Sequence, residues 1–438
     1  MTRSAAEATT DAIHAFNYWR ADAMLHLKDA FKQDAEYPLA QAVKGLILAT
    51  GRNTNYQGMV DACLQCARDG QESIPVSQRR YVDALDALAR GELTQAVTVY
   101  EQILAQYPTD LFVHRLAQQE LFWMGEARWM ADIAESSAAA WSEADKGYGM
   151  FLSVHAFALE EAGDRARAER LARQAVELDA GDLWGAHAVA HVLEMQGRVD
   201  EGIDWLRDLH GNWAGGNQIV HHLWWHMCLF LLERGEHAQI LEIFDAHIRN
   251  MQSSLVIAVP DVYIDIQNVA SLLMRLELRG VDVGARWSSV AEVAQQRIDN
   301  HATAFTDAHA VMILAACGEF DNAATLLNSM KTFAMHCEGS LGPRYSSAAI
   351  PAARAAIAHR RGDHRAVVNA LLPARRALWQ MGGSHAQRDV YSQLLVDSLM
   401  KLGEHRWLAT VLAEQRAVPF EHLEQRTLYA DAVALLSQ

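Results

Sequence analysis

The chain has 438 residues, of which 51% are hydrophobic, 21% charged and 8% aromatic, so it is too apolar to be a disordered protein. Its formal net charge of −16 argues against a nucleic-acid binder, which carries a basic excess, and against a polybasic membrane anchor. Five cysteines, no apolar leader and no run of about 18 apolar residues predict a soluble, cytoplasmic protein.

Helix-forming residues dominate, and apolar residues recur at spacings of three and four, which predicts an all-α fold. Glycines follow the helical runs at intervals of about 34 to 45 residues, and a period near 34 marks the tetratricopeptide repeat (TPR) helix–turn–helix unit. The series is Gly91, Gly125, Gly163, Gly197, Gly235, Gly280, Gly318, Gly362 and Gly403. The sequence therefore predicts a TPR-like α-solenoid or superhelix of about nine units, with residues 1–438 forming a single domain.

The first helix of each unit, called helix A here, lines the concave face of such a solenoid, and the second helix lies outside. We predict helix A at 110–124, 148–162, 183–196, 218–234, 258–279, 303–317, 346–361 and 384–402. Loops are expected at 213–217 and 335–345. An array of this length can curl around a pocket, so residues on the predicted A helices are the candidates for a site.

Two successive A helices carry pairs of histidines. His187 and His191 are four residues apart and Glu194 is three beyond His191, so all three share one helix face. His222 and His226 form a second pair on the next A helix. Because packed helices lie about 8–10 Å apart, the four histidines can meet at one divalent metal ion, with zinc, iron and manganese as candidates.

Other residues of the A helices supply the expected remainder of a histidine-rich pocket. Glu194 is predicted as a fifth metal ligand or as a general base, and His309, oriented by Asp307, as a proton shuttle. Arg388 is predicted to hold a carboxylate of the ligand. The predicted ligand-binding residues are His155, Trp184, Trp224, Trp225, Asp265, Asn268 and Arg388.

Several blocks of sequence together resemble the tetratricopeptide repeat protein 38 family over nearly the whole chain. These blocks are Tyr107 to Asp110, His187 to Met195, His222 to His226, Asp307 to His309, and Gly382 to Ser384 with Ala386 to Val390. The resemblance implies an all-helical superhelix and no settled activity. Gln118 and Gln119 stand where animal members carry a His-Asp pair, so this chain lacks one ligand if the family uses a metal, or that helix shapes a substrate.

Two classes of function follow from these features. The first is a small-molecule enzyme or binder with hydrolase- or lyase-type proton chemistry in the pocket, in which the metal is an optional part. The alternative is a non-catalytic TPR adaptor that binds a peptide or protein partner in its concave groove. The histidines can also form a purely structural polar network. Segment 423–438 is apolar on one face, which suits either a homodimer or a cap on its own array.

Overall fold

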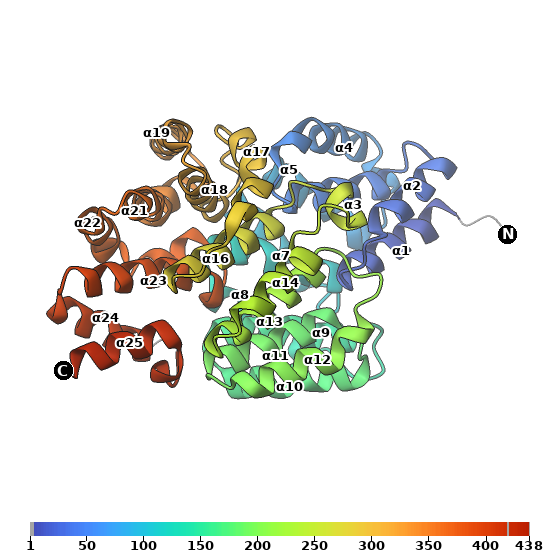
Figure 1. Ribbon diagram of the computed structural model, residues 1–438. Helices are drawn as coiled ribbons and strands as arrows, with labels where there is room; N and C mark the ends of the chain where they lie inside the picture. The colour runs from blue at the N-terminus through green and yellow to red at the C-terminus, as the bar shows by residue number, and fades with distance from the viewer. Residues whose placement is uncertain (1–3, 418–419, 438) are drawn as a thin grey trace. The chain divides into compact units, whose positions relative to one another are not determined.

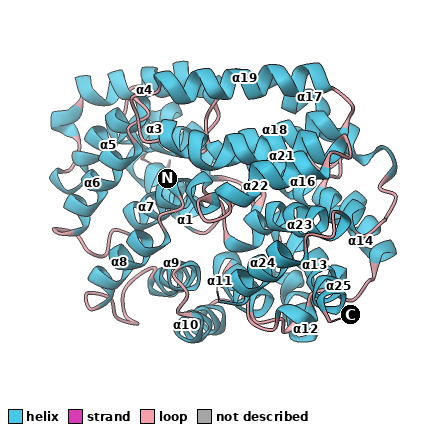
Figure 2. Ribbon diagram, turned by 90° about the vertical axis from the view of Figure 1, so that its left-hand side faces the viewer, coloured by secondary structure: helices cyan, strands magenta, loops and turns pink. Residues whose placement is uncertain are grey.

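The computed structural model describes residues 4–417 and 420–437, and helices account for most of them (Figure 2). Within these ranges the extended pairing consists of one antiparallel bridge between Arg20 and Gly216. The predicted all-α class is therefore confirmed. No helix among the described residues is both long and apolar enough to cross a membrane.

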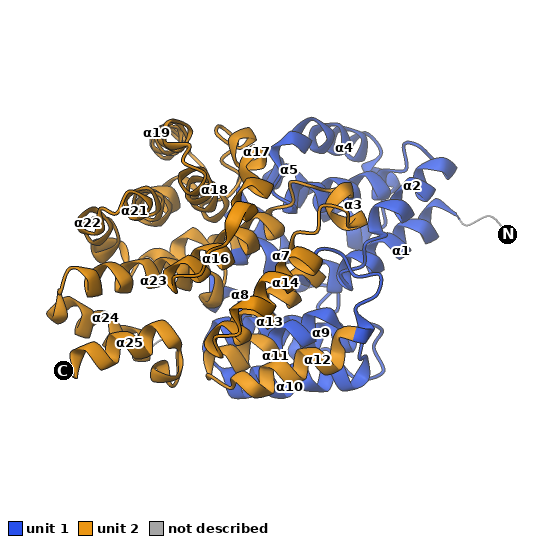
Figure 3. Cartoon of the chain, viewed as in Figure 1, with its two compact units in different colours: residues 1–122, 126–188, 211–219 blue, residues 123–125, 189–210, 220–438 orange. Residues whose placement is uncertain are grey.

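The chain divides into two compact units, shown in blue and orange in Figure 3. Unit 1 comprises residues 1–122, 126–188 and 211–219, and unit 2 comprises residues 123–125, 189–210 and 220–438. Helices α7, α11 and α13 each contribute residues to both units. That residues 1–438 form a single domain stays a prediction.

The helices follow one another through turns and loops, and most of them are labelled in Figure 1. The first eleven are α1 (Ala5–Asn17), α2 (Ala23–Gln33), α3 (Pro38–Thr50), α4 (Gln57–Asp69), α5 (Arg80–Ala89), α6 (Leu93–Leu104), α7 (Leu111–Met124), α8 (Ala127–Ala138), α9 (Tyr148–Glu161), α10 (Arg165–Leu178) and α11 (Leu183–Met195). The next seven are α12 (Val199–Leu209), α13 (Ile219–Glu233), α14 (His237–Ile243), α15 (Ser254–Ala258), α16 (Tyr263–Leu278), α17 (Ser288–Gln296) and α18 (Ala304–Ala316). The last seven are α19 (Phe320–His336), α20 (Gly342–Arg344), α21 (Ile350–Arg360), α22 (His364–Ala374), α23 (His385–Lys401), α24 (His405–Ala417) and α25 (Thr427–Leu436).

The glycine series marks the turn inside each helix pair, as predicted. All nine glycines have a φ between +66° and +95°, and each follows the first helix of a pair by one or two residues. In this left-handed region a Cβ is strained, so glycine ends the first helix and lets the chain reverse into the second. The turns of the helix–turn–helix units therefore lie at the positions that the glycine series predicts.

The predicted A helices match α7, α9, α11, α13, α16, α18, α21 and α23. The predicted helix at 258–279 starts late, because α15 ends at Ala258 and Pro260 keeps Val259 extended before α16 begins. The predicted loop at 335–345 is shorter, since α19 runs to His336 and α20 begins at Gly342. Segment 213–217 is irregular, as predicted.

Helices α16, α18 and α23 bury almost every residue along their length. Within unit 2, α18 packs against α16 and α21, and α23 packs against α16, α22, α24 and α25. A helix that is covered on all sides carries its polar side chains into the interior, where they must bond to one another. The polar residues of these helices are thus buried in a packed interior; the sequence predicted several of them as the lining of a concave pocket around which the array can curl.

Candidate metal centre

Three histidines of unit 2 converge where α11 and α13 meet. The ring centroid of His226 lies 4.6 Å from that of His191 and 4.7 Å from that of His222. One ligand nitrogen from each lies within 4.8 Å of the others. The three side chains are buried, with exposed fractions of 0% for His191 and His226 and 4% for His222. His187, the fourth predicted ligand, lies one turn before His191 on α11, in unit 1.

Two of these rings are fixed by hydrogen-bond acceptors behind them. His222 Nδ1 donates to Asn268 Oδ1 of α16 at 2.8 Å, and His226 Nδ1 donates to Glu194 Oε2 of α11 at 3.2 Å. Since Nδ1 carries the proton in both rings, Nε2 carries the lone pair. Metal-binding histidines have the same arrangement, in which an amide or carboxylate oxygen orients the ring from behind.

The surroundings keep these histidines neutral. Burial, followed by the neighbouring His226, lowers the pKa of His222 well below its usual value. Burial, followed by His191 and Arg275, lowers the pKa of His226 in the same way. A neutral imidazole is the form that coordinates a metal ion.

Tryptophan packs against one side of the cluster. The ring of Trp225 stacks on His222 with centroids 4.9 Å apart, and its Nε1 donates to Ser271 Oγ at 3.0 Å. Trp224 precedes it on α13 but stacks on His247 instead, with centroids 4.2 Å apart. Of the two predicted aromatic residues of this helix, Trp225 therefore belongs to the cluster and Trp224 faces another side.

Carboxylates sit behind the histidines. Glu194 holds His226 and lies 3.8 Å from the guanidinium of Arg426, so its contacts are those of a positioning residue. Asp265, on α16, accepts a hydrogen bond from His221 Nδ1 at 2.8 Å. Of these two carboxylates, Glu194 therefore supports a ring of the cluster, whereas Asp265 supports the neighbouring His221.

The expected pairing of Asp307 with His309 is wrong. Asp307 Oδ2 instead accepts hydrogen bonds from His301 Nδ1 at 2.7 Å and from the Tyr345 hydroxyl at 3.0 Å. His309 Nδ1 donates to the carbonyl of Phe305 at 2.8 Å, one turn earlier on α18. Residues two apart on a helix point to different sides, so the carboxylate cannot orient this ring.

Two predicted ligand-binding residues belong to unit 1. His155 on α9 lies 3.4 Å from Glu135. Trp184 stacks on Trp19 with centroids 4.7 Å apart, and its Nε1 donates to Gln118 Oε1 at 2.9 Å. Gln118 therefore serves as an acceptor for an aromatic side chain in the place where the resemblance expected a histidine.

Arg388, predicted to hold a carboxylate, lines a pocket of about 320 Å³ in unit 2. Its guanidinium donates to the carbonyl of Gly383, in the turn before α23. Ser384, at the end of that turn, caps α23 through a capping box with Gln387.

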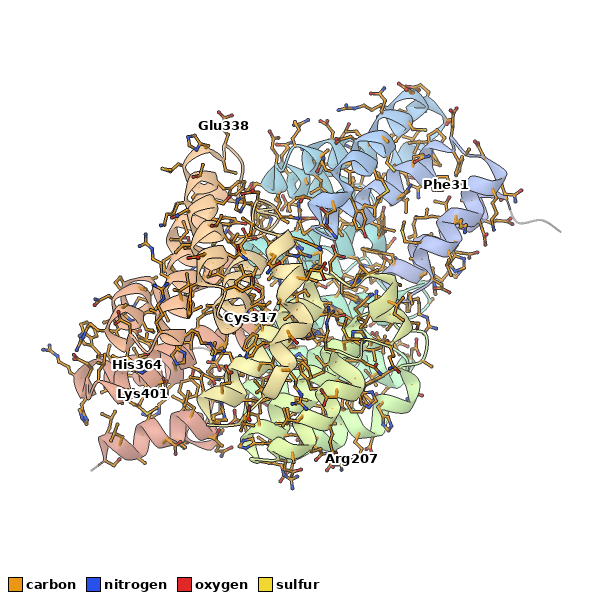
Figure 4. The ribbon with its side chains drawn as sticks, turned by 45° about the horizontal axis from the view of Figure 1, so that its top comes forward. Phe31, Arg207, Cys317, Glu338, His364 and Lys401 are labelled. Carbon is orange, nitrogen blue, oxygen red and sulfur yellow. The ribbon has the colours of Figure 1, made fainter. Side chains whose placement is uncertain are left out.

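Sequence analysis missed a second cluster that consists of His359, His364 and Asp397. His359 belongs to α21, His364 to α22 and Asp397 to α23. The cluster forms by packing of three helices, so no regular spacing in the sequence predicts it. His359 Nε2 lies 3.1 Å from Asp397 Oδ2, and Lys401 Nζ lies 3.0 Å from the same oxygen; His364 and Lys401 are labelled in Figure 4. The lysine neutralises the carboxylate, so the cluster forms an ion-pair network near the surface.

Repeated helix pairs with left-handed glycines and buried first helices make this chain an all-α, TPR-like helical repeat protein. No family model matches it, and its place in the tetratricopeptide repeat protein 38 family stays a prediction. Among solved structures it is similar to yeast Tom70, at 12% identity and a TM-score of 0.37 over 99% of this chain and 96% of that chain. It is also similar to human IFIT1 in a dimer with PPP-AAAA, at 12% identity and a TM-score of 0.35 over 84% of this chain and 89% of that chain.

Proposed function

We propose that this chain is a non-catalytic helical-repeat scaffold whose unit 2 holds a structural zinc ion on His191, His222 and His226. The convergence of these buried rings, two of them held from behind, carries the proposal. At Zn–N distances of about 2.0–2.1 Å, tetrahedral ligands lie roughly 3.4 Å apart, within the 4.8 Å that contains these nitrogens. His187 is the fourth ligand that the sequence spacing predicts.

Burial supports a structural role for the ion. A catalytic zinc keeps one position open to water and substrate, whereas a structural zinc is enclosed by its ligands. The exposed fractions of 0–4% for the three rings suit the enclosed type. We therefore favour the alternative function, a scaffold that binds a peptide or protein partner, over hydrolase- or lyase-type chemistry. Zinc fits better than manganese, which prefers oxygen ligands.

The test measures zinc in protein purified without a histidine tag. We expect near-stoichiometric zinc in the parent and its loss from His191→Ala, His222→Ala and His226→Ala. Metal that binds only the folded state raises stability, so a chelator should lower the melting temperature of the parent. Asn268→Ala, which removes the acceptor behind His222, should weaken zinc binding about 10–100-fold.

His221→Ala is the matched control, because His221 is the neighbour of His222 on α13, is 4% exposed and bonds to Asp265 outside the cluster. We expect this variant to keep its zinc. Circular dichroism of every variant shows whether the helices persist. A parent that takes up no zinc when the ion is supplied contradicts the proposal, as does equal zinc in the folded His221→Ala and His222→Ala proteins.

A further inference from the structure

The pocket beside Arg388 is a separate feature of unit 2. It is lined by α23, α24, the segment that follows α22 and Phe420, and its volume is about 320 Å³. This is near the lower end of the range for small-molecule sites, about 300–1,000 Å³. It shares no residue with the histidine cluster, so it can be considered apart from the zinc.

Positive charge gathers in this pocket although the chain as a whole is strongly acidic. Three arginines and two carboxylates are among its lining residues: Arg375, Arg376, Arg388, Asp389 and Glu414. Both oxygens of Asp389 bond to neighbours, Oδ1 to the Tyr429 hydroxyl and Oδ2 to Arg426 at 3.2 Å and to Gln393 at 2.6 Å. The Asp389 charge is thus matched by an arginine that does not line the pocket, and the lining keeps a positive excess.

The carboxylate of Glu414 is shared between two of the arginines. Arg375 Nε lies 2.7 Å from Glu414 Oε2, and Arg376 Nη2 lies 2.6 Å from Glu414 Oε1. One negative charge therefore faces two guanidinium groups. The Arg376 side chain is 74% exposed, so it can turn toward an incoming anion without loss of buried packing.

Apolar and aromatic side chains form the remaining wall. Phe420 and Leu395 are almost fully buried, and Trp379 is 41% exposed at the pocket. Large exposed tryptophan is uncommon on a soluble protein surface and is frequent in binding sites. Guanidinium groups bind carboxylates through paired hydrogen bonds, whereas aromatic walls bind flat apolar groups.

We infer that this pocket binds a small aromatic carboxylate, with its acid group on Arg376 and Arg388 and its ring against Trp379 and Phe420. The acid group competes with Glu414 for Arg376, and with the carbonyls of Gly382 and Gly383 for Arg388. The binding is electrostatic in part, so it weakens as the salt concentration rises.

Calorimetric titration of the full chain with 2-naphthoate and indole-3-acetate tests the inference, with the corresponding neutral amides as ligand controls. We expect the acids to bind and the amides to bind at least tenfold more weakly. Arg376→Ala should weaken binding of the acids about tenfold, because it removes a charge-assisted hydrogen bond. Arg388→Lys, which keeps the charge but loses the planar fork, should also weaken it.

Arg365→Ala is the matched control. Arg365 Nη2, on α22, lies 2.7 Å from Glu404, the residue before α24, and neither residue lines the pocket. This variant should therefore bind both acids as the parent does. Absence of binding in the parent overturns the inference. Equal affinity for acid and amide, or equal loss in Arg365→Ala and Arg376→Ala, overturns it as well.

Discussion

Asp182 caps helix α11 from inside unit 1. Its Oδ1 accepts hydrogen bonds from the amides of Trp184 at 3.0 Å and Gly185 at 2.9 Å, and its Oδ2 accepts one from Ser153 Oγ at 2.6 Å. These bonds favour the charged form, but burial outweighs them and raises the pKa of Asp182 to about 6. The folded protein therefore holds a proton at this carboxyl more tightly than the unfolded chain does.

This difference predicts a dependence of stability on pH. Between about pH 4 and pH 6 the folded state binds more protons at Asp182, so the free energy of unfolding falls as the pH rises through this window. Asp182→Asn stays neutral; its Oδ1 can accept the bonds from both amides, and its Nδ2 can donate to Ser153 Oγ, which reverses the third bond. Its stability relative to the parent should increase by about 2–3 kcal/mol from pH 4 to pH 7, as measured by urea unfolding.

Asp132→Asn is a control for the loss of an acid, since the Asp132 side chain is 55% exposed on α8. The difference between this variant and the parent should change little across the same range. A constant difference between Asp182→Asn and the parent would show that burial does not raise the pKa of Asp182.

Individual partners could be predicted only in part. The sequence placed Asp265 and Asn268 at the site, and the structure shows that each holds a histidine of α13 that is 44 or 46 residues away. Spacing within a helix gives the face on which a residue lies. The residue that it contacts on the next helix depends on how the two helices pack. The sequence therefore did not show whether Asp265 and Asn268 bind a ligand or hold a histidine ring.

At the scale of helix pairs, Gly202 of α12 lets this helix approach α13 closely. A Cβ at this position would lie 2.3 Å from Cζ of Phe230, a ring that is buried in unit 2. Alanine has the better helix propensity by about 1 kcal/mol, but overpacking costs about 1–3 kcal/mol, so the clash decides the sign. We expect Gly202→Ala to lower stability by about 1–2 kcal/mol and to lower the melting temperature in calorimetry.

Gly211→Ala provides the comparison, because a Cβ there meets no atom within 4 Å. This variant should melt like the parent. If Gly202→Ala also melts like the parent, Phe230 moves aside without cost.

The helices themselves were largely predictable. The glycines predicted where each A helix ends, because the residue after the helix adopts a left-handed conformation that favours glycine. Burial of the A helices on every side was not predictable, since periodicity shows which face of a helix is apolar and does not show how many neighbours cover it. In that buried setting, polar side chains of the A helices bond to one another across neighbouring helices.

At the scale of the whole chain, Arg426 links distant parts of unit 2. Its guanidinium lies 3.2 Å from Asp389 and 3.8 Å from Glu194 and from Glu233, and it stacks 3.8 Å from the centre of the Phe420 ring. Helix α25, which begins at the next residue, packs on α23 and α24, so this segment caps its own unit, as the sequence allowed. No sequence pattern singled out this arginine.

Removing this cation leaves the surrounding carboxylates buried beside fewer positive charges. Arg426→Met should therefore destabilise the protein by about 3–5 kcal/mol, measured by urea unfolding. Arg416→Met changes an exposed arginine of α24 and should stay within about 0.5 kcal/mol of the parent. Parent-like stability of Arg426→Met would mean that the carboxylates take up protons instead.

The position of Arg426 in the chain also affects how the protein is made. A ribosome releases Glu194, Glu233 and Asp389 before it releases Arg426, which follows Asp389 by 37 residues. Before Arg426 is made, the three carboxylates lack this positive charge, so they remain in contact with water. These buried carboxylates of unit 2 therefore gain the positive charge of Arg426 only after residue 426 has been synthesised.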